Sequence, residues 1–142
     1  MYEKLISYLP ELEGENQQFG EWIVDRVNDG SPEHPIQMPF VSFGPVMEGI
    51  YNAVYEIVDQ HPELNLVKYQ DILKAHGIDW DGRLMKNADV SNWDAQGVLT
   101  LMLGIIRADR FSEGTFKEFM ENGCYAKWIR RLKEIEDEKD DC

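Results

Sequence analysis

The chain contains few of the residues that build disulfide frameworks or metal sites. Its 142 residues include two cysteines, Cys124 and Cys142, and three isolated histidines. A disulfide framework needs several paired cysteines, and a zinc site needs closely spaced cysteine and histidine ligands. We therefore expect no disulfide framework, no bound metal and no cofactor, and the cysteine usage favours a reducing, cytoplasmic setting.

Long apolar runs are also missing. The longest, Val98 to Ile106, is interrupted by Thr100 and Gly104. It is far shorter than the roughly 20 residues that cross a bilayer. The first ten residues lack the apolar core of a secretory signal. The sequence therefore predicts a soluble domain with no membrane contact.

Known catalytic fingerprints are absent from the sequence. It has no nucleophile elbow, no phosphate-binding loop of the Walker type and no dinucleotide fingerprint. "DWDG", Asp79 to Gly82, resembles half of a calcium loop, but the closing glutamate would fall at residue 88, which is alanine. A turn is the favoured interpretation of this stretch. No catalytic residue is assigned. These absences favour a protein that is not an enzyme, and a small enzyme stays open as an alternative.

Basic residues are scarce and unevenly distributed. The net charge is −13, yet residues 104–133 carry seven basic and four acidic side chains, a local charge of +3. The remainder carries −16 and should repel nucleic-acid phosphates, so direct nucleic-acid binding is not expected. The asymmetry could instead orient a protein partner or a second copy of the chain.

Apolar residues recur at helical spacing along most of the chain. Residues 31–45 hold four of the six prolines and are expected to form an ordered loop, with room for a short edge strand within 39–43. Residues 92–109 are apolar around most of a helix and should form a buried hub. The expected helices are 2–9, 16–28, 45–60, 67–76, 92–109, 112–123 and 124–136, with one or two further turns within 78–89.

The fold class predicted from this pattern is all-α. We expect a compact single-domain bundle of six or seven helices over residues 1–136, followed by an acidic tail, 137–142. "SNWD", Ser91 to Asp94, has the form of a capping box at the start of the hub helix. Ser112 is the expected cap of the next helix.

The most distinctive candidate site is "GIIRADRFSEG", Gly104 to Gly114, at the end of the hub helix. In one interpretation, Arg107 and Arg110 project from a rigid helix end toward a phosphate or carboxylate group, which arginine binds in a bidentate manner. Tyr51 or Tyr55 could line such a pocket. The candidate ligand-binding residues are Arg107, Asp109, Arg110 and Trp80.

The alternative interpretation of this cluster is structural, and it is favoured. Cations at a helix C-terminus gain about 0.3–1 kcal/mol from the helix dipole. Arg107 would then bind the last carbonyls or pair with an acid, and Asp109 would fix the turn. Trp80 lies in a polar turn and is the tryptophan expected to be exposed.

Cys124 offers a second candidate chemistry. It lies at a predicted helix start with Lys127 one turn further on, and both features lower the pKa of a thiol. A free cysteine nevertheless usually packs as a small hydrophobic side chain. The packing role is the favoured interpretation.

The stretch "GIIRADRFSEG", together with "KNADVSNWDAQGVLTLMLG" before it and "TFKEFMENGCYAKWIRRLKEI" after it, resembles a family of small bacterial proteins. This is the domain of unknown function 6508 (DUF6508) family. The likeness is strongest over residues 69–135, which begin "YQDILKAHGI", and "IRADRF", Ile106 to Phe111, is its most specific element. The resemblance implies a bacterial or phage-borne domain and supplies no catalytic residues.

Three functional hypotheses follow from these observations. The first is a non-catalytic module that binds another protein or itself. The second is a small enzyme or ligand-binding domain with an anion pocket near Arg107 and Arg110. The third and weaker one is an acidic mimic of nucleic acid, which the basic segment 104–133 argues against.

Overall fold

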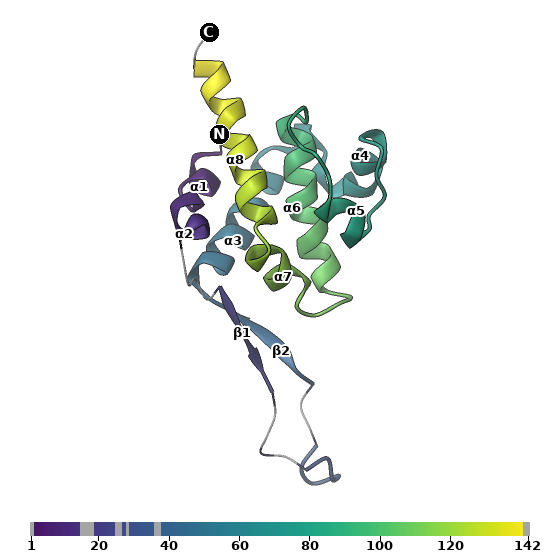
Figure 1. Cartoon of the computed structure of the whole chain (residues 1–142). Coiled ribbons are helices and arrows are strands. Elements are labelled where there is room, and N and C mark those ends of the chain that lie inside the picture. The colour runs from purple at the N-terminus through teal and green to yellow at the C-terminus, as the bar shows by residue number, and fades with distance from the viewer. Residues whose placement is uncertain (1, 15–18, 25–26, 28, 36–37, 141–142) are drawn as a thin grey trace.

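The protein consists of a helical body and one projecting hairpin (Figure 1). The computed structural model describes residues 2–14, 19–24, 27, 29–35 and 38–140. Antiparallel strands β1 (Gly20–Ile23) and β2 (Phe40–Phe43) form the hairpin. The helices are α1 (Glu3–Ile6), α2 (Leu9–Glu13), α3 (Pro45–Gln60), α4 (Tyr69–Ala75), α5 (Gly82–Lys86), α6 (Ala95–Asp109), α7 (Thr115–Glu121) and α8 (Cys124–Asp140), with 3-10 turns at Pro62–Leu64 and Leu66–Lys68.

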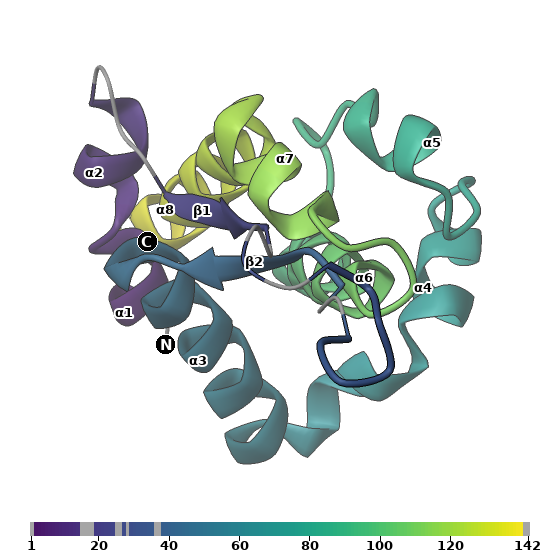
Figure 2. The ribbon, with the colours of Figure 1, turned by 90° about the horizontal axis from the view of Figure 1, so that it is seen from below.

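Helix α6 is the hub that the sequence predicted. Every residue from 97 to 106 is buried, which means that neighbours surround the helix on all sides. Helices α3, α4, α7 and α8 all pack against it, and Figure 2 shows α6 in the middle of the body. No helix in the described part of the chain is long and apolar enough to cross a membrane.

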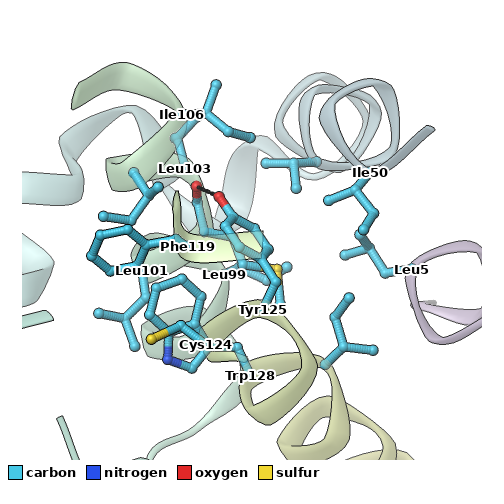
Figure 3. Packing of buried hydrophobic residues seen from close by; sticks show 14 of the residues in the cluster. Leu5, Ile50, Leu99, Leu101, Leu103, Ile106, Phe119, Cys124, Tyr125 and Trp128 are labelled. Atoms are coloured by element: carbon cyan, nitrogen blue, oxygen red, sulfur yellow. Dashed lines mark hydrogen bonds between the residues drawn. The ribbon is translucent and has the colours of Figure 1, made fainter. Parts of the chain in front are cut away.

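The core joins residues that are far apart in the sequence (Figure 3). Trp128 and Tyr125 of α8 pack beside the leucines of α6, and Leu5 of α1 and Ile50 of α3 reach the same cluster. The buried Tyr125 hydroxyl donates a hydrogen bond of 2.8 Å to the carbonyl oxygen of Met102. Burial of a hydroxyl without a hydrogen-bond partner costs free energy, and this bond offsets that cost for the Tyr125 phenol.

The first predicted helix, 2–9, is divided in two. The break falls at Ser7 and Tyr8, and Pro10 lies in the first turn of α2. Proline is tolerated there because the first N–H groups of a helix have no partner within the helix. Pro10 is therefore the second residue of α2 and does not end a helix.

The helix predicted over 16–28 is wrong, and the all-α class is accordingly incomplete. Residues 20–23 form β1, with Gly20 opposite Phe43 and Ile23 opposite Phe40. Trp22 and Ile23 have side chains that suit a strand, and pairing with β2 supplies their backbone partners. Residues 16–18, 25, 26 and 28 of the predicted helix lie outside the described residues. The edge strand expected within 39–43 is confirmed as β2.

Two predicted helix starts are also wrong. Helix α6 begins at Ala95, and the Asp94 carboxylate accepts from the N–H of Gly97, so Ser91 lies outside the helix. Helix α7 begins after Gly114, whose φ is 97°, and no side chain at that N-cap position makes a cap bond. Ser112 therefore does not cap α7.

The helix ends and the remaining caps agree better with the sequence pattern. Gly77 and Gly123 adopt φ values of 87° and 88°, as expected for helix terminators. Asp81 caps α5 by accepting from the N–H groups of Arg83 and Leu84. The "DWDG" stretch thus begins a short helix, in line with its favoured interpretation as a turn. Helix α8 continues to Asp140, beyond the expected end near 136.

Candidate functional site

Arg107 lies in the last turn of α6 and is only partly satisfied by its surroundings. Its guanidinium carbon is 5.7 Å from the centre of the Tyr55 ring on α3, a cation–π contact. The Nε atom is buried and has no hydrogen-bond partner. The Tyr55 hydroxyl is buried as well and makes no hydrogen bond of good geometry, although the Tyr51 hydroxyl lies near it. A buried polar atom without a partner is costly, so two of them in neighbouring side chains require an explanation.

A row of aromatic rings connects this arginine to the hairpin. The Tyr55 and Tyr51 rings are 4.9 Å apart, and the Tyr51 and Phe43 rings are 5.9 Å apart. Phe43 of β2 then meets the edge of Phe116 of α7 at 5.3 Å. The hairpin base, α3 and α7 therefore share one set of ring contacts beside Arg107.

Asp109 has a structural role at the end of the same helix. One of its carboxylate oxygens accepts from the N–H groups of Gly114 and Phe116, at 3.0 and 3.1 Å. The carboxylate thus serves the start of α7, where Ser112 was the expected cap. Burial raises the pKa of Asp109, aided by Glu113 and opposed by the backbone N–H groups. The loop between α6 and α7 is closed by this side chain.

Arg110 is exposed at the C-cap of α6. Among the described residues it makes no ion pair and no side-chain hydrogen bond. Its charge nevertheless acts on Tyr55, because burial raises the pKa of that phenol while Arg107 and Arg110 both lower it. The charges of both arginines therefore act on the same tyrosine.

Trp80 has a different place from the one expected. It is half-buried, and its indole N–H donates a 2.8 Å hydrogen bond to the carbonyl oxygen of Gly104 on α6. Its ring meets Tyr69 and Phe111 edge to face, at 5.3 and 6.1 Å. The indole N–H is thus already used in holding the loop before α5 to the hub helix.

Cys124 shows the packing behaviour that was favoured for it. The side chain is buried at the first residue of α8. Burial raises the pKa of its thiol, although Lys127 and Lys86 oppose the change. A raised pKa reduces the thiolate fraction on which nucleophilic reactivity depends. Within the described residues, no group of three or more histidine, cysteine and acidic side chains is arranged to hold a metal.

The hairpin is the feature that the sequence interpretation missed. Two contacts with the segment between α6 and α7 fix its base. The Val41 N–H donates a 2.7 Å hydrogen bond to the Glu113 carboxylate, and the Trp22 ring lies directly over Gly114. The consecutive apolar residues Trp22, Ile23 and Val24 were the available signal, since aromatic and β-branched runs favour a strand.

Replacing Gly114 with alanine should loosen the hairpin from the body. A Cβ at this position would lie 2.4 Å from the Trp22 ring, at a φ of 97° that only glycine adopts easily. We expect a loss of about 1–3 kcal/mol in the free energy of unfolding, from αL strain and the displaced ring. Urea titration followed by tryptophan fluorescence measures it.

Gly77→Ala provides the matched control for that variant. Gly77 has a similar φ of 87° but nothing within 4 Å of the added Cβ, so it reports the backbone strain alone. The difference between the two variants isolates the Trp22 contact. Equal losses would mean that Trp22 does not hold the hairpin against Gly114.

These features define a small, mainly helical protein with a buried central helix and one projecting hairpin. The chain belongs to the family of unknown function DUF6508, whose family model matches residues 1–138. The match extends well beyond the stretch 69–135 in which the resemblance is strongest. Comparisons with curated proteins and with solved structures found no match.

Proposed function

We propose that the protein is a non-catalytic module that binds another protein, or a second copy of itself, through its hairpin. One observation carries the proposal. Of the nine large hydrophobic side chains that are exposed in the described part of the chain, six belong to residues 22–40. Exposed apolar side chains that gather in one place mark interaction surfaces. The six are Trp22, Ile23, Val24, Val27, Met38 and Phe40.

The shape of the hairpin supports the same proposal. It extends away from the helical body (Figure 1), so its outer part has little contact with the core. A two-stranded hairpin is marginally stable by itself in water. Exposed β-strands can also extend a partner's sheet or accept a further strand. Burial of these side chains by a partner would therefore stabilise the hairpin and supply binding free energy.

The test removes the apolar side chains without disturbing the base of the hairpin. In the double variant Val24→Ser/Met38→Ser, two exposed side chains become polar, while Val41 and Trp22 keep their contacts with the body. We expect the wild-type mass in light scattering to rise with protein concentration, or a tagged wild type to retain a defined partner. The double variant should lose that association.

The matched control carries the same kind of change on the helical body. Val67 and Leu84 are exposed apolar residues outside the hairpin, so Val67→Ser/Leu84→Ser lowers exposed hydrophobicity without touching the proposed surface. The control should associate as the wild type does. A wild type that stays monomeric and captures nothing, or equal behaviour of both double variants, would contradict the proposal.

A further inference from the structure

The basic side chains between residues 104 and 133 are accounted for by internal contacts, with two exceptions. Five of them bind carboxylates or backbone carbonyls. Lys117 pairs with Glu121, Arg130 with Glu13 and Lys133 with Asp137; Lys127 donates to the carbonyls of Lys86 and Ala88; and Arg131 donates to the Trp93 carbonyl and pairs with Glu134. Within the described residues, Arg107 and Arg110 have no such partner.

The unpaired state of Arg107 is unusual because the side chain is partly enclosed. Its Nε atom has no contact with solvent and no acceptor. The two terminal guanidinium nitrogens also have no acceptor among the described residues. Unlike Nε, they are not buried, so a ligand can reach them. Arginine presents its donors in a fixed fork that matches the oxygens of a carboxylate or phosphate.

Tyr55 adds a third donor in the same place. Its ring lies under the Arg107 guanidinium, and its buried hydroxyl makes no hydrogen bond of good geometry, with the Tyr51 hydroxyl as a neighbour. Arg110 is the C-cap residue of α6, three positions after Arg107, and both arginines lower the pKa of this hydroxyl, so each lies within electrostatic reach of it. The two guanidinium groups and this hydroxyl therefore offer several hydrogen-bond donors in one place on a chain whose net charge is −13.

We propose that Arg107, Arg110 and the Tyr55 hydroxyl bind an oxyanion, the phosphate or carboxylate group of a small molecule, at the end of α6. Such a group would supply acceptors to donors that have none, and charge-assisted hydrogen bonds of this kind are the strong ones. The site adjoins the hairpin base through Tyr51 and Phe43. It does not require that the hairpin bind a protein.

Asp109 and Trp80 are not part of this site, although the sequence grouped them with the arginines. The Asp109 carboxylate is turned to the N–H groups of Gly114 and Phe116, and the Trp80 N–H is used by Gly104. Neither side chain has a free group to offer an anion. Of the four candidate residues from the sequence, only the two arginines remain in the proposed anion site. Tyr55 of α3 joins them.

Isothermal titration of the whole protein with inorganic phosphate, and separately with citrate, tests the proposal and distinguishes a phosphate from a carboxylate ligand. We expect saturable binding of at least one probe. Arg110→Ala should weaken it about tenfold or more, because a hydrogen bond between charged groups is lost. Tyr55→Phe keeps the ring under Arg107 and removes only the hydroxyl, so it should weaken binding without abolishing it.

Lys74→Ala is the matched control, since it removes one exposed positive charge two residues before His76, which contacts Asp94 and Gly97 at the N-terminal end of α6. It should bind both probes as the wild type does, which excludes a general effect of net charge. Circular dichroism of every variant verifies that the fold is retained. Absence of saturable binding of both probes, or an equal effect of Arg110→Ala and Lys74→Ala, would overturn the proposal.

Discussion

Truncation of Phe116 to alanine is expected to lower the free energy of unfolding by about 3–5 kcal/mol, the usual cost of deleting a buried aromatic ring. Phe116 is completely buried. Its ring centre lies 5.3 Å from that of Phe43, 6.5 Å from that of Tyr51 and 5.2 Å from that of Tyr125. The cavity would therefore open where β2, α3 and α8 converge on α7, and the hairpin should lose its attachment together with global stability.

Phe111→Ala is the internal comparison for that variant. Phe111 lies five residues earlier and is 82% exposed, so its truncation should change stability by no more than about 0.5 kcal/mol. Urea denaturation monitored by far-ultraviolet circular dichroism gives both values. If Phe116→Ala lowered the free energy of unfolding as little as Phe111→Ala does, the aromatic contacts of Phe116 would not stabilise the fold.

Asp109→Ala is expected to cost about 2–3 kcal/mol, since the half-buried N–H groups of Gly114 and Phe116 would lose their acceptor. Asp109→Asn should be far milder, because the amide oxygen can accept from the same two groups. The contrast between these variants separates the hydrogen-bonding role from the charge. Thermal or urea unfolding of both proteins at pH 7 measures it, and equal losses would contradict the capping role of the oxygen.

The charge of Asp109 makes a separate contribution that depends on pH. Burial raises the pKa of the folded carboxyl above its ordinary value, so the folded state holds this proton more tightly than the unfolded state does. The associated stability is present below the ordinary pKa of about 4 and is lost as pH rises through the raised folded pKa. Asp109→Asn should lack that loss. Its stability relative to wild type should accordingly increase with pH over this window.

The helical body was predictable because its signals are local. In α6 a long apolar sequence spans residues 98–106, and no arrangement other than burial on all sides suits it. Gly77 and Gly123 end helices because a positive φ is easy for glycine alone, and this preference is visible in the sequence. Such features do not depend on distant residues, and so one sequence was sufficient to place them.

The features that escaped prediction depend on distant partners. Phe19, Trp22, Ile23 and Val27 fit a helical stripe when considered alone, and only pairing with residues 40–43 selects the strand. The sequence predicted Ser112 as the cap of α7. Instead, the carboxylate of Asp109, in the preceding helix, accepts from the N–H groups of Gly114 and Phe116 at the start of α7. At the candidate site the two arginines were visible in the sequence. Their lack of acceptors and the buried Tyr55 hydroxyl beside them appear only in three dimensions.

The packing of α1 and α2 against α8 has a consequence for the order in which the protein can be assembled during synthesis. Glu13 of α2 meets Arg130 of α8 across 117 residues of sequence. Helices α1 and α2 therefore cannot dock on α8 until that later helix has been synthesised. Until then Leu5 and Leu9 have no α8 to cover them, and closing so long a loop costs entropy. The part of the core between α1, α2 and α8 can thus form only after α8 has been synthesised.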